Sequence, residues 1–188
     1  MNPNAAVANA GGVTMNGVDA GLTLRPIHGL ELYNSVSYDH AVYDQGNTSA
    51  GVYYDIKGQQ VVNYPKFMYK AMLSYTYHGA TAWIDGSYMS ARNFTYMGDV
   101  KAPEYWILNL GAEYKFGNLG QYIHGADFVQ NLALDFTVTN LTNTSYIAAM
   151  GDYIGSGQPL SRSQNGYTAS GLFVGAPRQF FGSIRVEF

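Results

Sequence analysis

The amino-acid sequence predicts an all-β fold of about seven antiparallel strands that span a membrane. Three observations lead to this prediction. Segments of about ten residues alternate between apolar and polar side chains, which is the period of a strand. Only 12% of the 188 residues are charged, against roughly 25% in soluble domains. Aromatic residues reach 15%, and no apolar run approaches the roughly 18 residues that a transmembrane helix needs.

The first two strands are predicted near residues 17–25 and 30–44. In the first, Val18 and Leu22 lie on one side and Asp19 lies on the other. The stretch "PIHG" between the two strands has the residue types of a turn, so we expect these strands to form a hairpin.

The next two strands are predicted near residues 65–78 and 81–95, joined by a tight turn at Gly79. The earlier of them alternates strongly. The later one alternates least of all the segments, because Trp83 and Met89 fall on its polar side.

The last three strands are predicted near residues 104–116, 131–141 and 178–188. Each alternates with period two, and the final nine residues alternate up to the terminal Phe188. Such a series of strands, joined by alternating short and long connections, fits a transmembrane barrel or a soluble β-sandwich.

The placement of the charges favours the barrel. The apolar face carries charge only near the ends of segments, at Asp44 and Glu104. The polar face carries Asp19, Arg25, Glu31, Asp39, Lys66, Lys70, Asp85, Glu113, Lys115, Asp135, Arg185 and Glu187. Tyrosine and tryptophan lie near strand ends on the apolar face, where aromatic girdles meet lipid headgroups. The apolar face is therefore expected to contact lipid and the polar face to line a lumen.

The lengths of the connections predict the orientation. Outer-membrane barrels have short periplasmic turns and long extracellular loops. We therefore expect "PIHG", "HGA" and the longer turn at 118–130 to face the periplasm, together with the C-terminus. Residues 45–63, 96–103 and 142–177 are then the extracellular loops.

The sequence also resembles a known family, the TonB-dependent outer-membrane receptors, in the C-terminal portion of their β-barrel. The stretches that carry the resemblance follow the order of the family and cover most of the chain: "NAGGVTMNGVDAGLTLRPIHGLELYNSVSYDHAVYDQ", "GQQVVNYPKFMYKAMLSYTY", "APEYWILNLGAEYKFG", "LALDFTVTNLTNTSYIA" and "GAPRQFFGSIRVEF".

The resemblance implies a 22-stranded barrel in the bacterial outer membrane, whose lumen is filled by an N-terminal plug domain. It further implies active import of a scarce nutrient energised by the TonB complex, with ferric siderophores favoured over cobalamin, haem and oligosaccharides. No plug is present among these residues. We therefore expect the chain to be a fragment of a receptor, or the product of a truncated or split gene, with the missing plug, the remaining barrel strands and outer-membrane lipid as its partners.

No catalytic or metal-binding constellation is visible in the sequence. The four histidines lack a second ligand at metal spacing, and no serine stands in a nucleophile-elbow motif. The net charge of −3 does not suggest a nucleic-acid partner. We therefore predict no enzyme activity, no catalytic residue, no metal and no cofactor. The alternatives are a soluble carbohydrate-binding β-sandwich and an outer-membrane barrel enzyme.

Ligand contacts are expected from aromatic and cationic side chains of the loops, which could stack on a flat ligand or pair with an anionic chelate. The candidates are Tyr53, Tyr54, Arg92, Tyr146, Tyr153, Arg162, Tyr167 and Phe173. The alternative for each is that it packs one loop against another. In the last strand, Ile184, Val186 and Phe188 are expected to face lipid. By resemblance, an aromatic C-terminus of this kind is the signal that the barrel-assembly machinery reads.

Overall fold

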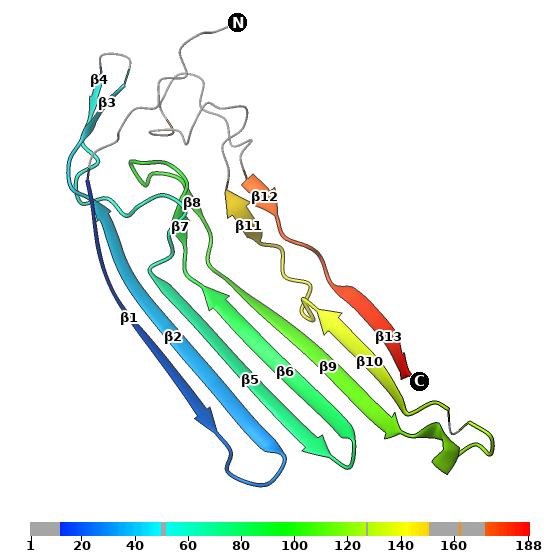
Figure 1. The fold of residues 1–188 in the computed structure, drawn as a ribbon. Coiled ribbons are helices and arrows are strands. Elements are labelled where there is room, and N and C mark those ends of the chain that lie inside the picture. The colour runs from blue at the N-terminus through cyan, green and yellow to red at the C-terminus, as the bar shows by residue number, and fades with distance from the viewer. Residues whose placement is uncertain (1–11, 50–51, 127, 151–161, 163–171) are drawn as a thin grey trace, which may run out of the picture.

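A computed structural model describes residues 12–49, 52–126, 128–150, 162 and 172–188. Its seven long strands form one antiparallel sheet in the order of the chain, which confirms the predicted fold class (Figure 1). The strands are β1 (Val13–Leu24), β2 (Leu30–Tyr43), β5 (Phe67–Tyr77), β6 (Ala80–Met89), β9 (Tyr105–Gly117), β10 (Asn131–Thr139) and β13 (Gln179–Glu187). No helix in the described part of the chain combines the length and the apolar character of a membrane span.

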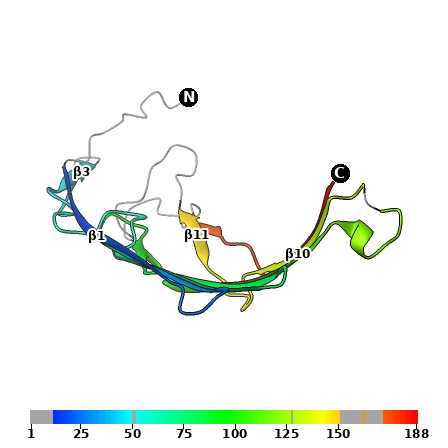
Figure 2. The same cartoon turned by 60° about the horizontal axis from the view of Figure 1, so that its bottom comes forward.

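The sheet is curved. Figure 2 shows that it is bent into an arc whose two edges are β1 and β13. Such an arc is the shape of a segment cut from a barrel wall. The register within the sheet is regular, and the only shift among the seven long strands lies between β9 and β10, near Leu132 and Ala133.

The apolar face of the sheet is the more exposed of its two faces. Register partners place Leu73, Ile84 and Leu110 together on it, and these side chains are 44%, 39% and 38% exposed. The opposite, polar face carries Asp85 and Asn109, which are half-buried. A soluble sheet would bury its apolar face, so this distribution is that of a barrel wall with lipid outside and a polar lumen inside.

Trp83 and Met89, which break the predicted alternation, are accommodated by β9. The indole ring of Trp83 lies over Gly111, where a Cβ atom would come within 2.0 Å of ring atom Cζ2. The hydroxyl of Tyr105 donates to the sulfur of Met89 across 3.4 Å. The glycine opposite Trp83 therefore provides the space for a large ring on the polar face.

The short connections all lie at one end of the sheet, at the bottom of Figure 1. Between β5 and β6, His78 and Gly79 have φ values of 44° and 83°, as a two-residue hairpin turn of the type that matches strand twist requires. The connection between β9 and β10 contains a short 3-10 helix, η1 (Leu119–Gln121), whose first turn is capped by the Asn118 side chain.

The long connections lie at the opposite end and form small ribbons of their own. The pairs are β3 (Asn47–Ser49) with β4 (Val52–Tyr54), β7 (Arg92–Asn93) with β8 (Lys101–Ala102), and β11 (Ile147–Met150) with β12 (Leu172–Val174). The largest fully buried side chains, Phe94, Ile56 and Thr95, lie in these connections and not in the sheet.

Two predicted boundaries differ clearly from the structure. The strand predicted at 81–95 ends at Met89, because Arg92 and Asn93 leave the sheet to pair with Lys101–Ala102. The loop predicted at 96–103 accordingly spans 90–104. The first strand begins at Val13 instead of residue 17, because its pairing with β2 continues as far as Tyr43.

Candidate functional site

The three long connections meet around a buried arginine, Arg92, which is 4% exposed. Its Nη1 atom donates to the side-chain oxygen of Asn63 across 3.1 Å and to the carbonyl oxygen of Ala148 across 3.5 Å. Its Nη2 atom donates to the carbonyl oxygen of Ile147. Arg92 therefore joins the β2–β5 connection to the β10–β13 connection. We call Arg92, Asn63, Asn93 and the groups that they bond the loop junction.

Asn93, the neighbour of Arg92, binds the same β2–β5 connection. Its side-chain amide donates to the carbonyl oxygen of Gln60 across 2.9 Å, and its own carbonyl accepts from the backbone N–H of Asn63 across 2.8 Å. Asn63 in turn donates from its side chain to the carbonyl oxygen of Met150 across 3.3 Å. Among the described residues, the Nε atom of Arg92 is the one buried side-chain polar atom without a hydrogen-bond partner. The other bonds of the junction hold the loops in one arrangement.

An apolar cluster packs beneath these hydrogen bonds. Phe94, Ala102 and Met150 are 2%, 1% and 6% exposed, and Val100, Ile147 and Leu172 pack against them. The cluster combines side chains from the connection between β6 and β9 with side chains of β11 and β12. The loop junction therefore has both a hydrogen-bonded layer and a hydrophobic core.

Asp99 makes a second contact between the β6–β9 connection and the β10–β13 connection. Its carboxylate accepts from the Thr95 hydroxyl across 2.6 Å and from the backbone N–H of Arg162 across 2.8 Å. Partial desolvation would raise the pKa of the Asp99 carboxyl, but these hydrogen bonds outweigh it and hold that pKa below its ordinary value. Asp99 is therefore ionised at neutral pH and retains both donors.

Aromatic side chains surround the junction. The rings of Tyr105 and Tyr146 lie 4.6 Å apart between centroids, and the guanidinium of Arg92 lies 6.0 Å from the Tyr105 ring. Gly175 packs directly on Tyr146, since a Cβ atom there would come within 2.0 Å of the ring. Tyr146 also lines a cleft of about 220 Å³ beside Glu104. This cleft gives one side of the ring access to solvent.

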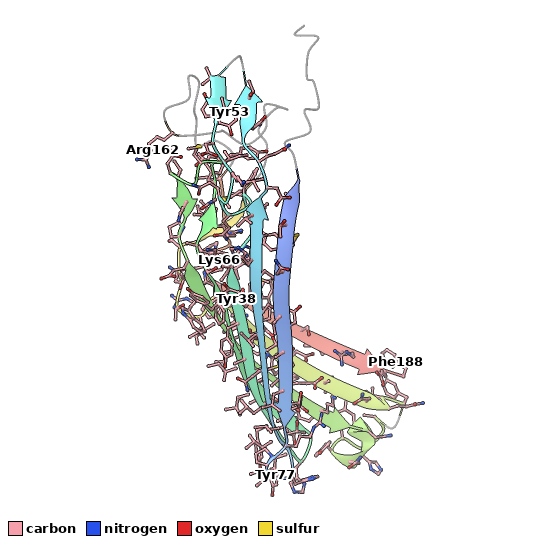
Figure 3. The ribbon with its side chains drawn as sticks, turned by 90° about the vertical axis from the view of Figure 1, so that its left-hand side faces the viewer. Tyr38, Tyr53, Lys66, Tyr77, Arg162 and Phe188 are labelled. Carbon is pink, nitrogen blue, oxygen red and sulfur yellow. The ribbon has the colours of Figure 1, made fainter. Side chains whose placement is uncertain are left out.

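The predicted ligand residues occupy different environments. Tyr53 and Phe173 are 64% and 54% exposed, Tyr54 is half-buried, and the side chain of Arg162 is exposed. Figure 3 shows Tyr53 and Arg162 at the same end of the sheet, opposite Tyr77. Tyr153 and Tyr167 lie outside the described residues.

Arg92 and Tyr146 come together at the loop junction. The Arg92 guanidinium already donates to the Asn63 side chain and to the carbonyl oxygens of Ile147 and Ala148. A ligand that binds this guanidinium would have to displace those groups.

Asn140 is a buried residue that the sequence analysis did not single out. Its side chain donates to the carbonyl oxygens of Thr144 and Ala176 across 2.9 and 3.0 Å, and accepts from the backbone N–H of Thr144 across 2.8 Å. Asn140 directly follows the last residue of β10, and its φ of 50° is incompatible with an extended strand. The available signal was a pair of asparagines, Asn140 and Asn143, directly after an apolar strand, since asparagine tolerates this conformation and bonds its own backbone.

The polar face of the sheet carries a group of paired charges. Arg185 lies 3.5 Å from Glu113 and 3.9 Å from Asp135, and Lys115 lies 3.2 Å from Glu113. Asn109 donates to Asp85 across 2.8 Å. Charged side chains of β9, β10 and β13 thus neutralise one another on the face expected to line the lumen. Within the described ranges, no group of three or more histidine, aspartate or glutamate side chains is arranged to hold a metal ion.

The protein-family description "TonB dependent receptor-like, beta-barrel" matches residues 2–174 of the chain. A comparison with curated protein sequences finds no significant match. Comparison with solved structures finds the siderophore receptor PiuA from Acinetobacter baumannii, which has a TM-score of 0.57 and 16% identity. That alignment covers 72% of this chain and 18% of PiuA.

Two further crystal structures are similar. BauA, the ferric preacinetobactin receptor from Acinetobacter baumannii, has a TM-score of 0.62 and 18% identity over 94% of this chain and 22% of its own. The ferric citrate transporter FecA has a TM-score of 0.58 and 18% identity over 83% of this chain and 20% of its own. The chain thus spans about a fifth of the length of each of these proteins.

Proposed function

Because the chain belongs to the TonB-dependent receptor family of β-barrels, we propose that it forms part of an outer-membrane receptor that imports a scarce nutrient with energy from TonB. The observation that carries this proposal is the pairing of an exposed apolar sheet face with a separate loop junction at one end. The sheet supplies a lipid-facing wall, and the junction supplies an ordered surface at which a ligand can be captured.

The ligand class supported best is an anionic iron chelate such as a ferric siderophore. The similar solved structures are described as siderophore, ferric preacinetobactin and ferric citrate proteins. In this chain, the exposed Arg162 offers a cation and the exposed Tyr53 and Phe173 offer aromatic surface for such a chelate. Tyr54, Arg92, Tyr146, Tyr153 and Tyr167 complete the proposed set. Cobalamin, haem and oligosaccharides are the alternative ligands.

A growth assay tests the ligand and the energy source together. The full receptor that contains these residues is expressed in a Gram-negative host without ferric receptors of its own, and the host is starved of iron. We expect growth on at least one ferric siderophore, and we expect this growth to be lost when TonB is deleted. Growth on haem or cobalamin alone would overturn the ligand class, and growth without TonB would overturn the energy source.

In the proposed orientation, the loop junction is extracellular, and the short connections and the C-terminus are periplasmic. The plug and the remaining strands lie outside these residues, and TonB acts through that missing part. The location of all short connections at one end of the sheet supports this orientation.

This chain contains no cysteine, so the orientation can be tested by labelling a single cysteine introduced into it, with the receptor without that substitution as the background. Tyr53→Cys and Ile123→Cys both replace exposed side chains, at opposite ends of the sheet. A thiol reagent that cannot cross the outer membrane should label Tyr53→Cys on intact cells and leave Ile123→Cys unlabelled. The reverse pattern would refute the orientation.

A further inference from the structure

The apolar face of the sheet contains a groove near its short-turn end, with a volume of about 540 Å³. Its floor is formed by three exposed alanines, Ala80, Ala82 and Ala112, on the adjacent strands β6 and β9. Ala82 and Ala112 are direct register partners, so their methyl groups lie side by side and form a depression. All lining residues belong to strands with both neighbours in place, so the missing part of a barrel would not alter the groove.

Aromatic rings form the walls of this groove. In one row across the sheet, Tyr75 and Phe136 flank the pair Ala82 and Ala112. In the next row, Tyr77 and Tyr114 flank Ala80. The rings of Tyr75 and Tyr77 are nearly parallel, with an interplanar angle of 7° and centroids 6.4 Å apart, so they stand side by side along one wall.

We propose that this groove is a binding site for one acyl chain of a phospholipid in the leaflet that meets the short turns. The volume lies within the range of about 300–1,000 Å³ that is typical of small-molecule sites. The groove is continuous with the exposed apolar face that contacts lipid, and its alanine floor lets a flexible chain lie deeper than the neighbouring side chains allow. The tyrosine hydroxyls at its turn end suit the headgroup region.

This inference depends on the membrane placement made under the proposed function, but not on the ligand or on TonB. The alternative to an acyl chain is that a second copy of the protein binds in the groove. A flexible chain is favoured because the groove is narrow, with a width of two alanines between bulky rings, whereas a rigid partner needs a broad complementary surface.

The test uses the full receptor purified in mild detergent, and native mass spectrometry measures the phospholipid that stays bound. Ala82→Leu and Ala112→Leu fill the floor of the groove. Each should displace about two methylene groups of the chain and lower the retained lipid about tenfold. Val18→Leu is the control, because Val18 is an exposed side chain on the same apolar face, outside this groove and outside the smaller groove that Ala20 lines.

Equal lipid retention in all three variants and the unchanged receptor would overturn the proposal. So would a dimer in the unchanged receptor that Ala82→Leu converts to a monomer with the same bound lipid, since the groove would then be a protein interface. Heat-dependent gel migration verifies that each variant forms a folded barrel. Iron uptake by the same variants should be unchanged. If the unchanged receptor binds lipid in the groove but imports no chelate, only the proposed function fails.

Discussion

Arg92 and Asn63 stand 29 residues apart in the chain, yet the guanidinium of one donates to the side-chain oxygen of the other across 3.1 Å. The same guanidinium reaches the carbonyl oxygens of Ile147 and Ala148 in a third segment. A single buried cation thus links all three connections. The proposed ligand residues are attached to these connections, so their spacing depends on Arg92.

Replacing Arg92 with methionine tests this dependence. Arg92→Met keeps much of the buried volume but leaves the Asn63 side chain and two carbonyls without a donor, which should weaken the loop junction by about 3 kcal/mol. Hydrogen exchange should accelerate at residues 60–64 and 147–150, and affinity for the imported chelate should fall. Exchange in the strands of the sheet should not change.

Arg162→Met is the matched control for that experiment. The Arg162 side chain is exposed, and methionine retains the backbone N–H that donates to Asp99. The substitution removes only the smaller attraction between the two charges. We expect this variant to lower affinity for an anionic chelate without faster exchange at residues 60–64. If both variants left affinity unchanged, the loop junction would have no part in binding.

Asn140 provides a second test, on stability. Asn140→Ala removes the three side-chain hydrogen bonds to Thr144 and Ala176. It also places alanine, which has no side-chain hydrogen bond to offset the strain, at a φ of 50°. We expect the free energy of unfolding in urea to fall by about 3–4 kcal/mol. Asn140→Gly loses the same bonds, but glycine has no β-carbon and adopts a φ of 50° without strain, so it should recover about 1 kcal/mol of that loss. Equal stability of the two variants would mean that the backbone conformation contributes nothing.

The sequence predicted the sheet because the relevant signals are local. The alternation that placed Ile84 and Leu110 on one face depends only on residue period, and the turn at His78 and Gly79 depends on two adjacent residues. The roles of Arg92 and Asn140 could not be predicted in this way. Their partners, at Ile147 and Ala176, lie in distant segments, and nothing in the local pattern distinguishes a buried arginine from an exposed one.

The pH dependence of the loops should follow Asp99. Because its pKa is lower in the folded loops than the ordinary value of about 3.9, ionised Asp99 stabilises the contact with Arg162 above that value. This stabilisation is lost as the pH falls through the lowered folded pKa. Hydrogen exchange at residues 95–100, corrected for the intrinsic rate, should therefore be constant from neutral pH to about 4 and rise below it.

The control for Asp99 is Asp99→Asn, which keeps an acceptor for Thr95 and Arg162 but has no charge to titrate. Its exchange should be somewhat faster at neutral pH and should show no further rise in acid. A rise in this variant as steep as in the unchanged protein would assign the acid sensitivity to a different group.

The terminal aromatic residue allows assembly to be separated from packing. Phe188 is 77% exposed, and its ring is stacked on Phe128 with centroids 6.2 Å apart and planes 1° from parallel. If Phe188 acts with Ile184 and Val186 as an assembly signal, its deletion should lower the amount of receptor in the outer membrane severalfold, while Phe128→Ala should have little effect. Equal losses in the two variants would mean that the contact with Phe128 matters and not recognition of the terminus. Quantitative immunoblotting of outer-membrane fractions, together with total receptor as a measure of synthesis, distinguishes these results.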